Sequence, residues 1–238
     1  MFRKGIKMQI HYEMSEYLQR SDEWFLVRKG RITSSNIWKI MGAPRSKKDV
    51  FSETAFTYIR ERVYELIMDD TVFLANQKAN GFENAATRWG NDNESYAREL
   101  YEKRTGLKVV ESFFCPYSKR TGGSFDGEIQ SENGLIEIKS PFNGSNHIEN
   151  WLMTSQKDLL KNSPAYYWQC MANILFAHAE YCDFTSFDPR MSDLMRLKVL
   201  RILPDEEAIN LLKERIELAE KLMTEMLSEI ISIAKEQK

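Results

Sequence analysis

The sequence predicts an α/β or α+β fold in which helices flank a mixed central β-sheet. Apolar residues recur at helical spacing before residue 105, whereas β-branched and aromatic residues dominate the segments between 107 and 139. No internal repeat and no linker rich in Pro, Gly or Ser divides the 238 residues, so we expect a single domain. It would comprise N-terminal helices over 15–105, a sheet over 107–203 and a C-terminal helix over 205–238.

Capping residues and apolar spacing predict four helices in the N-terminal part. Ser21 and Asp22 can cap the first, which carries Trp24 and Arg28, and hydroxyl side chains at 33–35 can cap the second. The third and fourth are amphipathic helices expected over 52–70 and 85–104.

The central part predicts strands, two of which form a hairpin. These strands are expected over 107–114, 123–130 and 135–139. Asn133 and Gly134 are a strong turn signal between the last two strands. Pro164 suits the first turn of a helix that runs to about residue 178. Two more strands, at 180–187 and 196–203, precede the C-terminal helix, whose apolar residues share one face.

The composition is that of a globular protein, with 42 % hydrophobic and 29 % charged residues. No apolar run approaches the roughly 18 residues that span a bilayer, and the N-terminus lacks the apolar stretch of a secretory signal. Three scattered cysteines without a CxxC pair predict reduced thiols in a cytoplasmic protein. Because the net charge is −2, any binding of nucleic acid would need locally concentrated basic residues.

The predicted hairpin carries the densest group of chemically useful side chains. Because strand side chains alternate, Glu137 and Lys139 share one face while Ile136 and Ile138 enter the other, and the hairpin brings Asp126 onto the adjacent strand. Two converging carboxylates suit Mg²⁺ or Mn²⁺, and a nearby lysine can orient or deprotonate a water beside a metal-bound phosphate. These are the parts of metal-assisted phosphodiester hydrolysis. On these features alone, a solvated surface pair of Glu137 and Lys139 stays equally open.

Further motifs occur in order around this hairpin and extend the pattern over about 22–192. The blocks are Trp24, Arg28, Gly30, Ile32, Thr33 and Ser35; Pro44-Arg45-Ser46; Trp89-Gly90 with Glu94; Asp126-Gly127; Glu137-Ile138-Lys139 with Pro141-Phe142; Gln169; and Asp188-Pro189-Arg190-Met191. Together they resemble the lambda exonuclease family and the wider YqaJ-type viral recombinase group, within the PD-(D/E)xK nuclease superfamily.

This resemblance implies a restriction-endonuclease-like core and a Mg²⁺-dependent 5′-to-3′ exonuclease, with Mn²⁺ as a possible substitute. Such an enzyme digests one strand of linear double-stranded DNA to mononucleotides from a 5′-phosphorylated end, leaving a 3′ overhang for phage-type recombination. The resemblance also implies a homotrimer, a single-strand annealing protein as partner, no membrane association, and the cytoplasm of a bacterial host carrying the phage or prophage.

The resemblance assigns roles to residues of the hairpin and of the fourth predicted helix. Asp126 and Glu137 would ligate the metal, helped by the Ile138 backbone carbonyl. Lys139 would position and activate the attacking water, and Glu94 would be a further catalytic and metal-binding acid.

The resemblance likewise assigns residues to the DNA. Arg28, Ser35 and Ser124 match residues that hold the 5′-terminal phosphate. Arg45 lies in a basic loop that would track phosphates, and Gln169 matches a glutamine beside the active site.

Two features depart from the family pattern or fall outside it. Phe125 stands where the superfamily has a proline, and residues 143–163 match nothing in the pattern, which leaves strand guidance and processivity open.

The Asp188-Pro189-Arg190 turn is expected to be a scaffold or subunit-contact marker, and no histidine is assigned a catalytic role. The alternative functions are an endonuclease on the same core, which would nick closed circular DNA, and a non-catalytic module that binds DNA ends.

Overall fold

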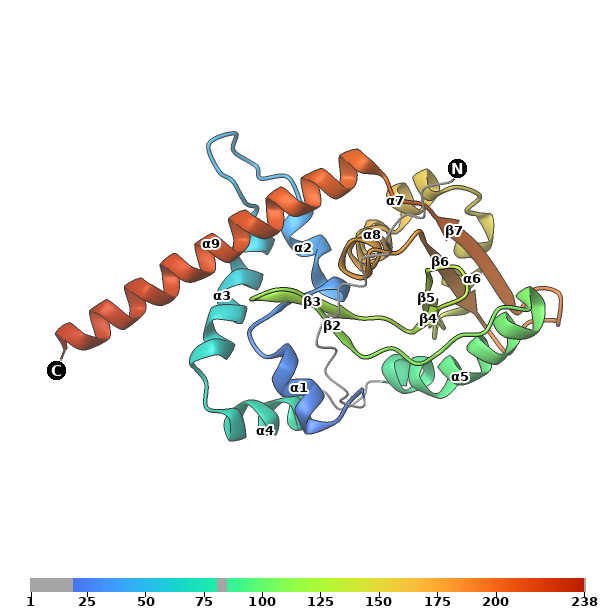
Figure 1. The fold of residues 1–238 in the computed structure, drawn as a ribbon, viewed down its shortest axis with the longest axis horizontal. Helices are drawn as coiled ribbons and strands as arrows, with labels where there is room; N and C mark the ends of the chain where they lie inside the picture. Colours follow the sequence, from blue (N-terminus) through green and yellow to red (C-terminus); the bar gives the residue numbers. More distant parts are fainter. Residues whose placement is uncertain (1–18, 81–84, 238) are drawn as a thin grey trace, which may run out of the picture.

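The computed structural model describes residues 19–80 and 85–237, so parts of the predicted domain at 1–18, 81–84 and 238 lie outside the described residues. Helices flank mixed β-sheets, which confirms the predicted fold class (Figure 1). The strands form two sheets, ordered β1-β3-β2 and β4-β5-β6-β7. Pairs β1–β3 and β5–β6 are parallel and the others are antiparallel. The strands are β1 (Ile32–Thr33), β2 (Phe114–Ser118), β3 (Thr121–Ser124), β4 (Gly127–Ile129), β5 (Gly134–Lys139), β6 (Tyr181–Phe187) and β7 (Leu197–Ile202).

Five α-helices and a 3₁₀ turn form the described N-terminal part. They are α1 (Asp22–Arg28), η1 (Ser34–Asn36), α2 (Trp38–Met41), α3 (Glu53–Ile67), α4 (Asp70–Asn80) and α5 (Ala85–Thr105). The predicted cap of α1 is confirmed, because Ser21 Oγ accepts from Trp24 N at 3.1 Å. Helix α4 was not predicted. It follows shortly after α3, and at its start Asp69 Oδ1 accepts a hydrogen bond from Thr71 N at 2.9 Å.

Two of the predicted strands differ from the structure. The strand expected over 107–114 is wrong, because β2 begins only at Phe114. In the segment before it, Val110 forms an isolated β-bridge with Glu128, and Val109 N donates a hydrogen bond to Glu102 near the end of α5. The strand expected over 123–130 is interrupted at Phe125 and Asp126. Its first half pairs within one sheet and its second half within the other. Asp126 therefore lies at the junction of the two sheets.

The predicted hairpin is confirmed, with Gly127 opposite Ile136 across β4 and β5. Asn133, in the turn, adopts a left-handed conformation with φ of 50°. A Cβ at Gly134 would lie 2.2 Å from the ring of Tyr181, so the close approach of β6 requires glycine there. This packing fixes the register of the strand that carries Glu137 and Lys139.

Helix α8 (Pro164–Ala177) runs through the middle of the molecule, as the end-on helix in Figure 1 shows. It begins at Pro164 as predicted, and it contacts strands of both sheets as well as η1 and α2. The unassigned segment 143–163 contains α6 (Gly144–Leu152) and α7 (Gln156–Asn162). Both are helices of fewer than ten residues that start at side-chain caps.

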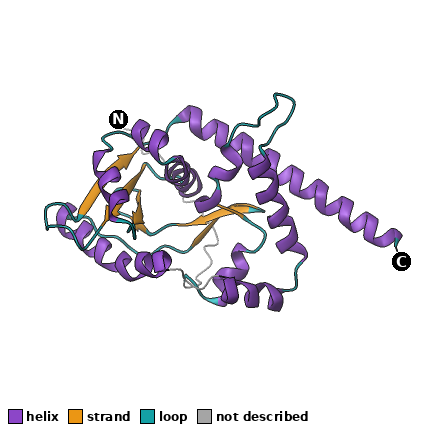
Figure 2. Cartoon of the chain, turned by 180° about the vertical axis from the view of Figure 1, so that it is seen from behind, coloured by secondary structure: helices purple, strands orange, loops and turns teal. Residues whose placement is uncertain are grey.

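The C-terminal helix α9 (Glu206–Glu236) packs on the body through its first half and extends beyond it (Figures 1 and 2). Its last buried residue is Met223. Glu220 accepts from Thr121 Oγ1 at 2.6 Å, and Arg215 Nε donates to Ile40 O at 2.8 Å. These bonds tie α9 to β3 and α2. Within the described ranges, every helix is too short or too polar to cross a membrane.

Candidate active site

The site lies where the junction of the two sheets meets β5. Glu137 faces α8, where Asn173 contacts it, while Ile136 and Ile138 pack with Ala97 on α5. The predicted alternation is therefore confirmed. Asp126 Oδ2 accepts a hydrogen bond from Ile138 N at 2.6 Å. This bond crosses from the junction to β5 and holds Asp126 beside the Glu137–Lys139 segment.

Glu137 is fully buried, with each carboxylate oxygen bound by a different partner. Lys139 Nζ forms an ion pair with Oε1, and Asn173 Nδ2 donates to Oε2 at 2.8 Å. Burial and the neighbouring charge of Asp126 raise the pKa of Glu137 to about 8, against the opposing effects of Lys139 and Asn173. The carboxylates of Glu137 and Asp126 are thus close enough for their charges to repel, and a bound cation would offset this repulsion.

Lys139 is positioned as a cation. Its Nζ lies 5.4 Å from the ring centroid of Tyr166, in addition to its ion pair with Glu137. Burial disfavours its charge, but Glu137 and Asp126 hold its pKa above the ordinary value. The ammonium is therefore available to orient a water or an anionic phosphate oxygen next to the carboxylates.

Glu94 enters the same electrostatic neighbourhood from α5. Its carboxylate pairs with Arg98 at 3.0 Å and with Arg20 at 3.4 Å. Burial and the charge of Asp126 raise its pKa. The charge of Asp126 thus acts on Glu94, whose role as a third acid of the site stays a prediction.

The donor set fits Mg²⁺ or Mn²⁺ through two carboxylates. Among the described residues, no three His, Cys, Asp or Glu side chains converge closely enough to form a complete metal cluster. Mg²⁺ commonly uses one or two carboxylates and retains several waters, so Asp126 and Glu137 satisfy its minimum requirement. Burial, and after it the charge of Asp126, raises the pKa of both Glu137 and Glu94, and the charge of a divalent cation would oppose these effects.

The predicted phosphate residues Arg28 and Ser124 lie in contact. Arg28 Nη1 and Trp24 Nε1 both donate to Ser124 Oγ, at 3.3 and 3.0 Å, and the guanidinium stacks 4.1 Å from the Trp24 ring centroid. Ser124 ends β3, two residues before Asp126. Arg28 also lines a cavity of about 240 Å³ between α1, η1, α3 and α4. Arg28 therefore connects this cavity with Ser124 at the end of β3.

The other predicted DNA residues differ in their distance from this group. Ser35 is exposed on η1, and its hydroxyl lies 3.3 Å from that of Thr33, which lines the same cavity. Arg45 is exposed on the loop between α2 and α3, and no described contact joins it to the hairpin (Figure 1). Gln169 is buried on α8. It lies one helical turn from both Tyr166 and Asn173, so all three share the face toward the site.

Sequence reasoning missed Asn173, whose Nδ2 binds Glu137 while its Oδ1 is buried without a partner among the described residues. Its spacing of four residues after Gln169 was the available signal.

Replacing Asn173 with Ala should lower the turnover number at least tenfold, because Glu137 loses its neutral donor. Steady-state kinetics beside thermal unfolding would test this. An unchanged turnover number in a folded variant would contradict it.

The Asp188-Pro189-Arg190 turn is a scaffold in this structure. Asp188 and Arg190 form a two-pronged ion pair at 2.8 and 2.7 Å. Arg190 also stacks 4.6 Å from the Trp89 ring centroid and donates to Phe142 O at 3.1 Å. Three motif segments at the end of β5 are thereby held together. His147 is buried between Ser186 Oγ and the Met195 carbonyl, and makes no contact with the site residues.

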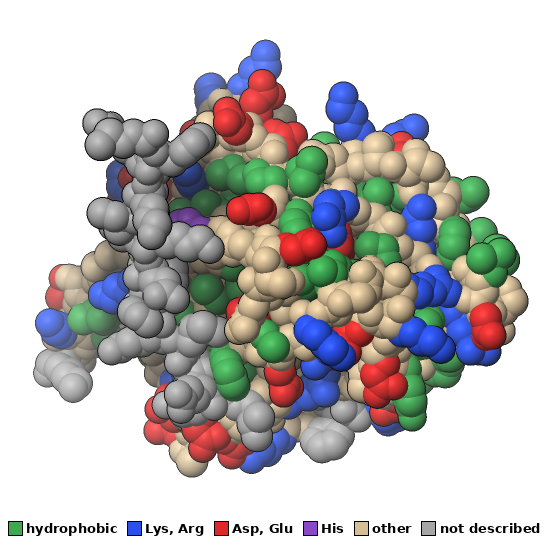
Figure 3. Space-filling view, turned by 45° about the vertical axis from the view of Figure 1, so that its right-hand side comes forward, with side chains coloured by type: hydrophobic (Ala, Val, Ile, Leu, Met, Phe, Trp, Pro, Cys, Tyr) green, Lys and Arg blue, Asp and Glu red, His purple; other side chains and the backbone are tan. Residues whose placement is uncertain are grey.

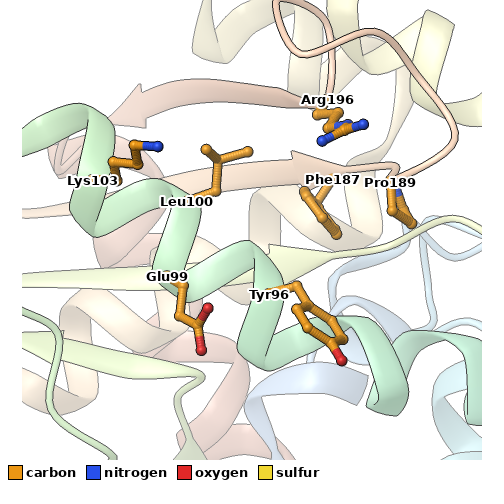
Figure 4. Close-up of a pocket in the computed structure, with 7 residues that line it drawn as sticks. All are labelled: Tyr96, Glu99, Leu100, Lys103, Phe187, Pro189 and Arg196. Atoms are coloured by element: carbon orange, nitrogen blue, oxygen red, sulfur yellow. The ribbon is translucent and has the colours of Figure 1, made fainter.

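A separate cavity of about 440 Å³ lies between α5 and the ends of β6 and β7 (Figure 4). It is lined by Tyr96, Glu99, Leu100, Lys103, Phe187, Pro189 and Arg196. None of these was predicted as a site residue. On the face in Figure 3, acidic and basic side chains are interspersed.

Comparisons with known proteins identify the family and the fold. The model of the YqaJ-like viral recombinase domain matches residues 23–180. An alkaline exonuclease of Laribacter hongkongensis is 24 % identical with a TM-score of 0.73, covering 92 % of this chain and 100 % of its own. Its complex with dAMP is 25 % identical, with the same TM-score and coverage.

A phage-related exonuclease of Haemophilus somnus is 21 % identical with a TM-score of 0.63, covering 87 % of this chain and 99 % of its own. No curated protein matches the chain. The family match extends over more than half of the sequence and includes the hairpin, Glu94, Arg28 and Gln169. The chain belongs to the YqaJ-like viral recombinase domain family.

Proposed function

We propose that the chain is a Mg²⁺-dependent 5′-to-3′ exonuclease that digests one strand of linear duplex DNA from a 5′-phosphorylated end. The family and the exonuclease fold support a nuclease. The observation that carries the proposal is the group formed by the buried Glu137 and the partly buried Asp126 and Lys139, together with the Arg28–Ser124 contact. Ser124 links the two groups, because it contacts Arg28 and lies two residues before Asp126, and this supports hydrolysis close to a bound 5′-terminal phosphate.

The residues divide into hydrolytic and positioning groups. When bound by Asp126 and Glu137, with Glu94 and the Ile138 carbonyl as further candidate ligands, Mg²⁺ supplies Lewis-acid stabilisation of the reacting phosphate. Lys139 orients the attacking water, and Asn173 keeps the Glu137 carboxylate aligned. Buried groups fixed by hydrogen bonds need little reorganisation during the reaction.

Direction would follow from binding of the strand end. Arg28, with Ser124 and Ser35, would hold the 5′-terminal phosphate while the next phosphodiester reaches Lys139. Arg45 and Gln169 would contact DNA near this path. Release of mononucleotides would leave a 3′ overhang, the substrate for a single-strand annealing protein in recombination in the host cytoplasm. A homotrimer, as the family resemblance implies, would keep the enzyme on its duplex.

The proposal is tested with linear duplex DNA that carries one 5′-phosphorylated end, in Mg²⁺ or EDTA, beside a closed circular duplex. We expect metal-dependent release of mononucleotides from the phosphorylated end and an intact circle. Nicking of the circle would indicate an endonuclease. Binding of ends without hydrolysis in Mg²⁺ or Mn²⁺ would indicate a non-catalytic module.

Replacing Arg28 with Ala should reduce the preference for 5′-phosphorylated over 5′-hydroxyl ends by about 10- to 100-fold, the range for a lost charge-assisted hydrogen bond. Initial rates on the two substrates, measured across Mg²⁺ concentrations, give the preference and the metal dependence separately. Equal loss on both ends would argue against a phosphate site at Arg28.

A further inference from the structure

The cavity beside α1 contains a second guanidinium that the predicted site did not include. Arg28 and Arg62 both line this space of about 240 Å³, together with one carboxylate, Glu65, and the polar side chains of Thr33 and Asn36. Arg62 comes from the middle of α3, and only 17 % of its side chain is exposed. Two arginines from different elements thus line one polar cavity.

The positive charge of Arg62 acts on the guanidinium of Arg28. Burial is the main cause that lowers the pKa of Arg28 to about 10; the positive charge of Arg62 also lowers it, whereas Tyr58 and Glu65 raise it. Arg28 has no salt bridge to a carboxylate among the described residues; its described side-chain bond is to Ser124. The two guanidiniums outnumber the single carboxylate of Glu65 in this lining, so the cavity favours an added anion.

Arg62 is fixed in place by its neighbours. Glu65 Oε1 pairs with it at 2.9 Å, and the guanidinium lies 4.9 Å from the ring centroid of Tyr58. Glu65 Oε2 accepts from Gly30 N at 2.9 Å, so both oxygens of this acid already have partners. Arg62 Nε is buried without a hydrogen-bond acceptor among the described residues. A positioned cation thus retains unused donor capacity.

We propose that Arg62 is a specificity-determining residue that, with Arg28, makes this cavity a site for a dianionic phosphate monoester. The inference rests on the proposed 5′-phosphate-dependent function. A terminal phosphate carries nearly two negative charges at pH 7, whereas an internal phosphodiester carries one. Two planar guanidiniums can each bind phosphate oxygens through paired donors, and Thr33 and Asn36 add neutral donors. The second cation therefore favours the strand end over the strand interior.

Replacing Arg62 with Gln tests this role, with Arg60→Gln as the matched control. Arg60 is exposed two residues away on the same helix, and its described contact is with Thr57 Oγ1. Each protein is mixed in EDTA with fluorescent duplexes that end in 5′-phosphate or 5′-hydroxyl, and the two dissociation constants are compared. R62Q should lower the preference for 5′-phosphate at least tenfold, whereas R60Q should keep the wild-type ratio.

Arg62→Lys provides a second variant, because it keeps the charge but loses the planar donor pair. It should retain an intermediate preference. A wild-type ratio in folded R62Q and R62K, measured where wild-type protein prefers 5′-phosphate, would overturn the role of Arg62 and leave the proposed function standing. Equal binding of both ends by wild-type protein would instead contradict the phosphate site itself.

Discussion

Replacing Lys139 with Ala should lower the rate of phosphodiester hydrolysis by about 10²–10⁴-fold, the usual effect of losing a positioned proton-transfer or water-orienting group. Lys139 is the cation paired with the buried Glu137, and Asp126 adds to the field that keeps it protonated. The rate is measured as nucleotide release from 5′-phosphorylated linear duplex in Mg²⁺. Duplex binding in EDTA should persist, since Arg28 and its cavity are untouched.

Two further variants make this result interpretable. Lys108→Ala removes a lysine whose side chain is 85 % exposed and should keep the wild-type rate. Lys139→Gln retains a hydrogen-bond donor toward Glu137, and so separates loss of the cation from exposure of an unpaired buried carboxylate. A wild-type rate in folded Lys139→Ala would contradict the proposed role of this lysine in orienting the attacking water.

The hairpin of the candidate site could be predicted from sequence because its signals are local. Asn133-Gly134 specifies the turn, and the alternation of Ile136 and Ile138 with Glu137 and Lys139 specifies the faces. Each signal depends on residues a few positions apart. The pairing of β4 with β5, and the side to which the Glu137 carboxylate points, follow from them.

The interruption at Asp126 could not be predicted in the same way. Residues 123–130 read as one strand, because both halves have strand-forming neighbours; the break arises because β3 pairs with β1 and β2 while β4 pairs with β5. These partners are distant in the chain. Residue propensity contains no information about such pairing.

Long-range contacts also explain the site residues that were missed. Asn173 and Arg62 are ordinary helical positions in the sequence. They become functional candidates only when α8 packs against β5 and α3 packs against α1 and η1. Arg45 shows the reverse case: its motif is clear, but its exposed loop makes no described contact with the hairpin, so its DNA role stays a prediction.

A buried polar network joins α5 to the sheet that carries the hairpin. Asp183 on β6 is 1 % exposed and lies opposite Ile136 of β5. It accepts from Tyr101 of α5 at 2.6 Å and from Arg201 of β7 through two bonds of 2.9 Å. Burial and the bond to Asp183 raise the pKa of the Tyr101 hydroxyl, so it stays protonated as a donor.

Replacing Asp183 with Ala should lower the free energy of unfolding by about 3 kcal/mol. The buried Tyr101 hydroxyl would lose its acceptor, which costs about 1–3 kcal/mol, and Arg201 would lose its partner at a smaller cost because it is half exposed. Chemical denaturation measures the change. Asp193→Ala is the control: that side chain is 91 % exposed and pairs with Arg196, so its loss should cost less than about 0.5 kcal/mol.

The effect on activity separates stability from catalysis. Asp183 touches neither Glu137 nor Lys139, but Tyr101 lies on the same helix as Glu94, two turns further along. If the network only stabilises the fold, Asp183→Ala should retain wild-type hydrolysis below its unfolding temperature. If it also fixes the position of α5, the rate should fall together with that of Glu94→Gln, and combining the two substitutions should give less than the product of their separate losses. A change in the free energy of unfolding no larger than that of Asp193→Ala would contradict the importance of the network.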